Sequence, residues 1–234
     1  MKNANYKTHT LFMVYFTREY QKFFQELSKN NSKAWFDSNR KRYEEHVKQP
    51  FAAFVEVMIS LIRADDPEVA ITAKDAIFRI NRDIRFSKQK SPYNAYMAAN
   101  VSKEGRKSKE WPGFYFQFSA DRVTVGGGAY MVEPPALYKI RKTIIRDLPS
   151  FKKVVTAKDF TSKYGSLQGE RNKILPPEFR QWVAKEPLVA NKQFYFMSDL
   201  DASVLLGKTL PDRLMSYYRA GRDISAFLKR AMTL

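Results

Sequence analysis

Apolar side chains in the first third of the chain recur at helical spacing. Within residues 17–27 they lie three or four positions apart, as expected for one helix face: Tyr20, Phe23, Phe24 and Leu27. Ser32 is a favoured N-cap and predicts a second helix, and Pro50 suits the first turn of a third. Asp65, Asp66 and Pro67 should end that third helix. This part of the chain therefore predicts a layer of helices.

The middle of the chain changes to the period of two that is typical of β-strands. Short segments rich in Phe, Tyr, Ile and Val are separated by charged or Gly- and Pro-containing turns, and they predict strands at 77–86, 95–102, 114–119 and 122–126. Ala120 and Asp121 indicate a tight hairpin between the last two strands. The polar residues 103–112 predict a solvated loop.

Helical spacing returns after the glycines at 126–128. One helix is expected from Glu133 to near Pro149, followed by short helices within 151–164 and a strand at 192–200. A helix over 211–220 should end at Gly221, and Asp223 should cap a terminal helix. The predicted fold class is α+β, with an antiparallel sheet of about four to six strands and helices packed around it. We expect residues 1–19 to be an N-terminal extension and residues 20–234 to form a single domain.

Composition narrows the classes of function. The 234 residues contain no cysteine, which excludes disulfides, thiolate metal sites and cysteine nucleophiles, and makes the cytoplasm the expected location. The longest apolar run near the start, residues 11–16, is too short for a signal peptide or a membrane span. The formal net charge of +17 favours polyanionic partners.

Residues 78–93 combine cationic and large apolar side chains and form the leading candidate site. The apolar residues Phe78, Ile80, Ile84 and Phe86 can anchor the backbone to a core. The expected anion-binding residues are Arg79, Arg82, Arg85, Lys88, Lys90 and Tyr93. In an extended strand Arg82 points to the apolar side, whereas a turn at Arg82 and Asp83 would let all three arginines converge, with Asp83 orienting a guanidinium and Tyr93 at the rim. The predicted ligand is small and phosphorylated.

Two other interpretations of this segment stay open. The arginines can be a structural hub of salt bridges in an interaction scaffold. They can also belong to a nucleic-acid-binding surface, because residues 79–109 contain nine basic and two acidic residues, interleaved with the aromatic side chains of Phe86, Tyr93 and Tyr96.

The remaining constellations are weaker. The glycines at 126–128 form either a phosphate-binding nest or a bulge at a strand end, and Asp199 and Asp201 are either cation ligands or turn and cap residues. His9 and His46 have no zinc-binding spacing, so no metal site is predicted. Asp83 and Glu170 are the candidate acids or bases, and capping is the alternative for Glu170. No cofactor is indicated.

The spacing of the arginine segment also resembles the signature of the domain-of-unknown-function 2461 family, which is uncharacterised and mainly bacterial. The matching positions are Arg79, Arg82, Asp83, Arg85, Phe86, Lys90 and Tyr93. The opening helices, residues 126–144, the 167–170 segment and the closing Phe227 and Leu228 are similar as well, so the resemblance covers roughly residues 20–230. Gln89 and the pair Pro177 and Glu178 depart from the family pattern. The resemblance implies a domain boundary and a candidate site, and it places Glu170 in a recurring motif without implying a reaction.

Overall fold

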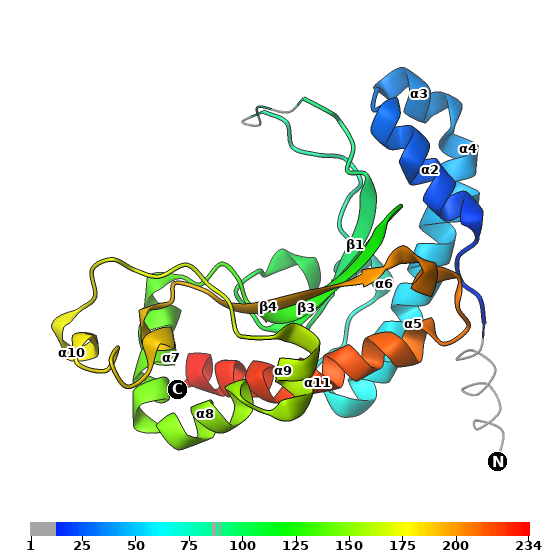
Figure 1. Ribbon diagram of the computed structural model, residues 1–234. Coiled ribbons are helices and arrows are strands. Elements are labelled where there is room, and N and C mark those ends of the chain that lie inside the picture. The colour runs from blue at the N-terminus through cyan, green and yellow to red at the C-terminus, as the bar shows by residue number, and fades with distance from the viewer. Residues whose placement is uncertain (1–12, 86–87, 89) are drawn as a thin grey trace, which may run out of the picture. The chain divides into compact units, whose positions relative to one another are not determined.

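The chain folds around a four-stranded antiparallel sheet with helices packed about it, as shown in the computed structural model of Figure 1. The structure describes residues 13–85, 88 and 90–234. The strand order is β1 (Tyr96–Val101), β2 (Gly113–Ser119), β3 (Arg122–Ala129) and β4 (Phe194–Asp201). The predicted α+β class and the predicted number of strands are thus confirmed.

The first helices follow the apolar pattern closely. Helix α2 (Arg18–Lys29) buries the four residues that the spacing selects. Helix α3 (Lys33–Ser38) begins at the predicted cap, where the Ser32 hydroxyl accepts a hydrogen bond from the Trp35 N–H at 3.3 Å. Helix α5 (Gln49–Asp65) ends where the two aspartates and the proline were expected to end it. Periodicity and capping therefore identify this layer correctly.

The separation between the second and third helices was predicted wrongly. Helix α3 stops at Ser38, and α4 (Arg40–Tyr43) continues through the π-helical turn η1 (Glu44–Lys48) into α5. Pro50 is the second residue of α5, and only Gln49 separates it from the π-helical turn. Because a proline lacks the N–H that an α-helical turn needs, a change of hydrogen-bond pattern just before it lets the helix continue.

The described residues fall into two compact units, and the chain passes between them several times. The first unit contains the residues up to Arg106 with Tyr115–Val125 and Asp199–Met215, and the second contains Lys107–Phe114, Gly126–Ser198 and Ser216–Leu234. Neither unit is continuous in sequence. The expectation of one domain over residues 20–234 stays a prediction.

An aromatic core holds the first unit together. Phe16, Phe51 and Phe54 are fully buried, and each contacts the ring of Phe116 or Phe118 on β2 at centroid distances of 5.4 to 6.0 Å. The Tyr20 hydroxyl donates to the Phe118 carbonyl at 3.0 Å, which satisfies a polar group inside this core. Short helix α6 (Ala73–Ala76) and the 3-10 turns η2 (Gly105–Lys107) and η4 (Ala202–Leu206) complete the regular structure that begins in this unit.

The β2–β3 hairpin forms as predicted, but the glycines after it do not form a phosphate-binding nest. Strand β3 continues through Gly126, Gly127 and Gly128 to Ala129. A Cβ on Gly126 would overlap the Met197 sulfur, and one on Gly127 would lie 2.7 Å from the Gly113 carbonyl oxygen. The glycines therefore allow neighbouring strands to approach closely, which is a packing role.

Helices of the second unit include α7 (Pro134–Arg146), α8 (Leu148–Val155), α9 (Lys158–Tyr164), α10 (Pro177–Arg180) and the 3-10 turn η3 (Pro187–Ala190). Residues 168–171 pair with 191–195, at and just before the start of β4, through the bridges Gln168–Tyr195 and Arg171–Asn191. The expectation of two closing helices was wrong, because α11 (Leu210–Thr233) is one helix. Gly221 lies inside this helix and does not end it. A Cβ at this position would overlap the Phe196 ring, so packing explains the glycine.

Within the described part of the chain, no helix has the length and hydrophobicity to cross a membrane.

Candidate anion-binding ribbon

The described part of the arginine segment runs antiparallel to residues 92–99 through isolated bridges and a few backbone hydrogen bonds, and it is not a regular strand. We call these two paired segments the basic ribbon (residues 77–99). Ile77 pairs with Ala99 and Asn81 pairs with Tyr93. The Arg82 N–H donates to the Pro92 carbonyl at 2.9 Å, which is the outermost backbone pairing among the described residues, and the Asn94 N–H donates to the Ile80 carbonyl at 2.7 Å. Figure 1 shows the ribbon extending beyond β1. The prediction of a regular strand at 77–86 was therefore wrong: the described residues pair only at isolated points, as far as Arg82, and Phe86 lies outside the described residues together with Ser87 and Gln89.

The two strands of the ribbon are unequal in length. Six positions separate Tyr93 from Ala99, but only four separate their partners Asn81 and Ile77. The returning strand therefore contains a bulge of two residues, and bulges bend a strand and increase its twist. The bulge lies where the ribbon leaves the sheet, since β1 begins at Tyr96.

Tyr93 anchors the ribbon to the helices of the first unit. Its side chain is 6% exposed and its ring stacks on Phe36 of α3, with centroids 4.1 Å apart and planes 16° from parallel. The sequence places Tyr93 at the rim of the site; the structure corrects this, because burial against Phe36 outweighs exposure of the hydroxyl. Tyr93 therefore supports the ribbon from beneath.

Asn31 fixes the same position through its side-chain amide. The Asn31 Nδ2 donates to the Tyr93 carbonyl at 2.9 Å, and the Asn31 Oδ1 accepts from the Tyr93 N–H at 3.1 Å. Because the flanking residues make the backbone bonds across the ribbon, Tyr93 is in a pair whose own N–H and C=O point outward. The amide of Asn31 thus takes the place of a neighbouring strand.

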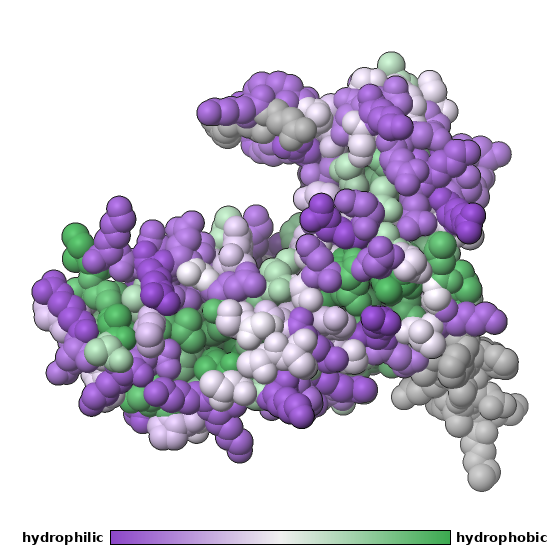
Figure 2. Space-filling view, in the orientation of Figure 1, coloured by the Kyte–Doolittle hydropathy of each residue, from purple (hydrophilic) through white to green (hydrophobic). Residues whose placement is uncertain are grey.

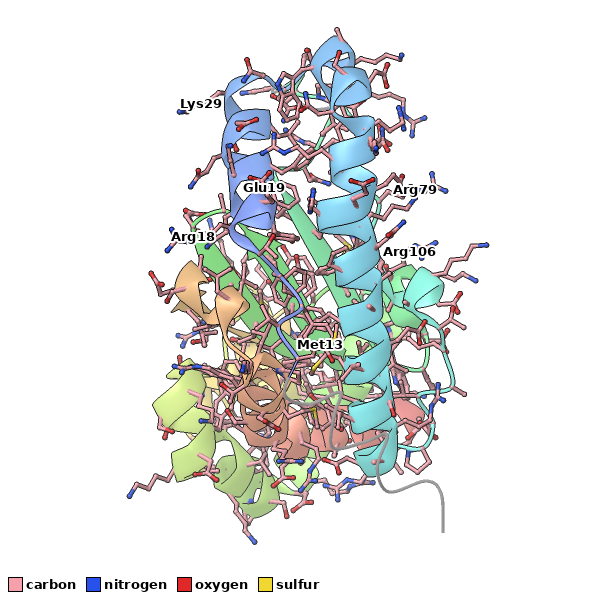
Figure 3. All side chains as sticks on the ribbon, turned by 90° about the vertical axis from the view of Figure 1, so that its right-hand side faces the viewer. Met13, Arg18, Glu19, Lys29, Arg79 and Arg106 are labelled. Atoms are coloured by element: carbon pink, nitrogen blue, oxygen red, sulfur yellow. The ribbon has the colours of Figure 1, made fainter. Side chains whose placement is uncertain are left out.

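The charged side chains of the ribbon lie at its surface. Figure 2 shows hydrophilic side chains on the part of the ribbon that is drawn in colour. Arg79 and Asn81 are exposed and alternate with buried Ile80, while Arg82 is half-buried. Figure 3 shows the Arg79 side chain pointing outward at the surface. Up to Arg82 the segment thus has the alternation of the extended geometry, with Arg82 on the side of Ile80.

Arg85 is held by its neighbour Asp83. The Arg85 Nε and Nη2 donate to the two carboxylate oxygens of Asp83 at 3.0 and 2.6 Å, and the Arg85 N–H donates to the same carboxylate at 3.2 Å. The side-chain bond from Arg85 lowers the pKa of Asp83 below its usual value. Both groups are exposed, so solvent weakens the pair. Asp83 orients a guanidinium here and is not placed as a buried acid or base.

The two lysines of the segment are also exposed. The Lys90 ammonium donates to the Ile84 carbonyl at 3.1 Å, across the outer part of the ribbon. Lys88 lies close to the undescribed residues and is exposed as well. Arg79, Arg85, Lys88 and Lys90 are therefore all open to solvent.

A second group of charges, which sequence reasoning missed, lies next to Tyr93. Asp37 on α3 binds Lys33 at 2.6 Å and Arg40 at 2.5 Å, and Arg40 lies over the Phe36 ring at 5.5 Å. The hydrogen bond to Asp37 is the main cause that raises the pKa of Lys33, and the Tyr93 hydroxyl adds to the effect. The helical i, i+4 spacing of Lys33 and Asp37 is visible in the sequence, but their position beside Tyr93, some 60 residues later, is not.

The other predicted site residues do not form a centre. Glu170 belongs to the second unit, is exposed, and lies 3.6 Å from the Lys192 ammonium as a surface ion pair. Asp201 accepts the Ser203 N–H at 2.8 Å, which confirms the capping alternative, and Asp199 accepts the Thr124 hydroxyl at 2.5 Å. Among the described residues, no three acidic or histidine side chains gather to bind a metal. His9 lies outside that part of the chain.

Comparison with known proteins agrees with the resemblance seen in the sequence. A family model described as "Conserved hypothetical protein (DUF2461)" matches residues 19–227, which include the whole basic ribbon and most of each unit. A comparison with curated proteins finds no match. Because the matched region covers most of the chain, the protein belongs to the domain-of-unknown-function 2461 family.

Proposed function

We propose that the protein binds nucleic acid and that the basic ribbon contacts the phosphate backbone. The observation that carries the proposal is the exposure of Arg79, Arg85, Lys88 and Lys90 on a ribbon that is anchored through the buried Tyr93. Residues 77–99 contain five basic side chains and one acidic side chain. An exposed array of this kind suits a ligand with many phosphates.

The arrangement favours an extended polyanion over the small phosphorylated ligand expected from sequence. A pocket for a small anion needs several donors that converge on one enclosed point. Here four cations are open to solvent, and the Arg85 guanidinium is already shared with Asp83. A phosphate bound by single, exposed cations would gain little, whereas several such contacts along one strand add together.

The shape of the ribbon fits a duplex groove. A two-stranded antiparallel ribbon is one of the elements that the major groove of DNA admits. Arg79 and Asn81 are exposed two positions apart, so they lie on the same face of their strand. An arginine and an amide side chain both form bidentate hydrogen bonds to base edges. These features support a duplex as the ligand.

The test is fluorescence anisotropy with a labelled DNA duplex, an RNA duplex and a single strand, each at two salt concentrations. The ribbon variant is Arg79→Gln with Lys88→Gln and Lys90→Gln. The control replaces three exposed lysines of the second unit, Lys152→Gln, Lys153→Gln and Lys158→Gln, and changes the net charge equally. Inorganic phosphate and a nucleoside triphosphate serve as competitors.

We expect the ribbon variant to reduce the slope of log affinity against log salt by about 2 to 3, since each phosphate contact contributes about 0.9. The control should leave the slope nearly unchanged. Equal losses in both variants would mean that binding follows the net charge of +17 and not the ribbon. Competition by inorganic phosphate at matched ionic strength would support a small-anion site instead.

A further inference from the structure

The second unit exposes large hydrophobic side chains together with lysines. Of the described residues, the large hydrophobic ones that are exposed away from the ends of the described chain are Tyr130, Met131, Tyr138 and Ile174. All four belong to the second unit. Single exposed hydrophobic residues need no explanation, but a concentration of them in one unit points to an interaction.

Two of these residues lie where α7 meets the segment around α10. The Tyr138 ring contacts the Phe179 ring edge to face at 5.3 Å, and Phe179 is only 1% exposed. The Arg180 Nε donates to the Leu175 carbonyl at 2.8 Å, which fixes the turn that precedes Phe179. Leu175 and Phe179 thus attach this segment to the unit.

Ile174 remains outside this packing. It is 80% exposed, the highest value among the large hydrophobic residues that the structure describes, although its neighbour Leu175 is buried. Burying such a side chain would stabilise the fold by about 1.5 kcal/mol or more. The segment buries Leu175 and Phe179 but leaves the Ile174 side chain in solvent, so it does not make this contribution to stability.

Lysines accompany the aromatic residues of this region. The Lys142 ammonium lies 5.6 Å from the centre of the Tyr138 ring, and the Lys185 ammonium lies 5.0 Å from the Trp182 ring. Residues 171–185 contain four basic side chains and one acidic side chain. We call Tyr138, Lys142, Ile174, Trp182 and Lys185 the α7–α10 surface. Figure 2 shows hydrophobic and hydrophilic side chains interspersed over α7 and α10, at the left of the view.

We infer that the α7–α10 surface binds an acidic, amphipathic segment of a partner protein. The hydrophobic side chains of such a segment would cover Ile174 and Tyr138, and its carboxylates would pair with Lys142 and Lys185. Charge complementarity selects this partner, because a purely apolar segment would leave the lysines unpaired. A nucleic-acid strand fits less well, because its bases can stack on Tyr138 and Trp182 but it has no aliphatic side chain to cover Ile174.

The experiment uses the full chain and a labelled helical peptide with leucines on one face and glutamates beside them. A scrambled peptide of the same composition, which lacks the apolar face, is the control ligand. Ile174→Asp and Lys142→Ala are the test variants. Val14→Asp, at a 41% exposed residue of the first unit, is the control variant.

We expect the amphipathic peptide to bind in preference to the scrambled one. Ile174→Asp should weaken binding about fivefold or more, and Lys142→Ala should weaken it less but reduce its salt dependence. Val14→Asp should bind like the unmodified protein. The ribbon variant Arg79→Gln, Lys88→Gln, Lys90→Gln should also bind the peptide normally, so this result is independent of nucleic-acid binding.

Several outcomes would overturn the inference. Equal binding of both peptides would show attraction by charge alone, and no measurable binding of either would remove the proposed partner class. An Ile174-dependent dimer in analytical ultracentrifugation would identify a second copy as the occupant. Ile174-dependent binding to vesicles of phosphatidylserine and phosphatidylcholine, without peptide binding, would identify a lipid surface.

Discussion

Arg141 is a buried cation whose guanidinium group is held by backbone carbonyl oxygens. It is 4% exposed, and its Nε and Nη2 donate to the carbonyls of Val189 and Asn191 at 2.8 and 3.0 Å. Burial lowers its pKa below the usual value for arginine. At the other end of η3, the buried Glu186 carboxylate accepts the Leu188 N–H at 3.1 Å. Glu186 at the N-terminal end and Arg141 at the C-terminal end thus complement the dipole of this short turn.

Replacing Arg141 should destabilise the protein. Arg141→Met leaves two buried carbonyl oxygens without donors, so the free energy of unfolding should fall by about 2 to 4 kcal/mol. Urea unfolding followed by circular dichroism measures this loss. Lys142→Met, at the exposed neighbouring position, should change stability by less than about 0.5 kcal/mol. Equal effects of the two changes would contradict the capping role of Arg141.

Asp83 should limit the affinity of the ribbon for nucleic acid. Arg85 lowers the pKa of Asp83, so the pair is intact above the usual aspartate range and is lost only as pH falls through the lowered value. Asp83→Asn should therefore tighten duplex binding about twofold to fivefold, equally at about pH 6 and about pH 8. Anisotropy titrations at both pH values measure the change. Asp159→Asn, at an exposed position of α9, is the control, and equal tightening there would mean that only net charge matters.

At the scale of elements, the basic ribbon depends on one amide. Asn31→Ala removes both bonds to the Tyr93 backbone, which should cost about 1 to 2 kcal/mol and loosen the ribbon locally. Hydrogen exchange at Tyr93 and Asn94 should accelerate. Duplex affinity should fall while its salt slope stays the same, because the cations are retained. Asn30→Ala, which removes only an exposed bond to the Glu26 carbonyl, should leave exchange in the ribbon unchanged.

Helix α11 offers a test of packing against helix propensity. Alanine is favoured over glycine inside a helix by about 1 kcal/mol, yet a Cβ at position 221 would overlap the Phe196 ring. Gly221→Ala should therefore lower the free energy of unfolding by about 1 to 2 kcal/mol overall. Combining it with Phe196→Leu should cost less than the sum of the two single changes in urea unfolding. Strict additivity would show that the ring is not the obstacle.

These elements show what the sequence can and cannot predict. Periodicity identified α2, α5 and the β2–β3 hairpin because each depends on local spacing and capping. Gly221 was misread as a helix end, because its reason is the ring of Phe196 on another element. The cations of the ribbon were found from composition, whereas the Asn31 contact joins residues 62 positions apart and leaves no local signal.

At the scale of the whole molecule, the two units are covalently interleaved. β2, β3, β4 and α11 each contribute residues to both units. An element cannot easily melt in one half while staying ordered in the other, so we propose that residues 20–234 unfold as a single domain. Small domains unfold in this cooperative way, and shared strands extend the argument to this longer chain.

Single-tryptophan variants test this proposal. Trp35 belongs to the first unit and Trp182 to the second. One variant keeps only Trp35 and the other keeps only Trp182, with phenylalanine at the remaining tryptophan positions. Their fluorescence midpoints in urea should each coincide with the midpoint measured by circular dichroism on the same variant. Two separated transitions in either protein would show that the units unfold independently.

The Asn31 amide also affects how readily copies of the protein can associate through the edge of the basic ribbon. A two-stranded ribbon exposes backbone donors and acceptors along its outer edges, where a strand from another molecule can add. At Tyr93 both outward groups are already occupied by a side chain of the same chain. Strand addition at that point would have to displace Asn31 first, so the contact that supports the ribbon also protects its edge against aggregation.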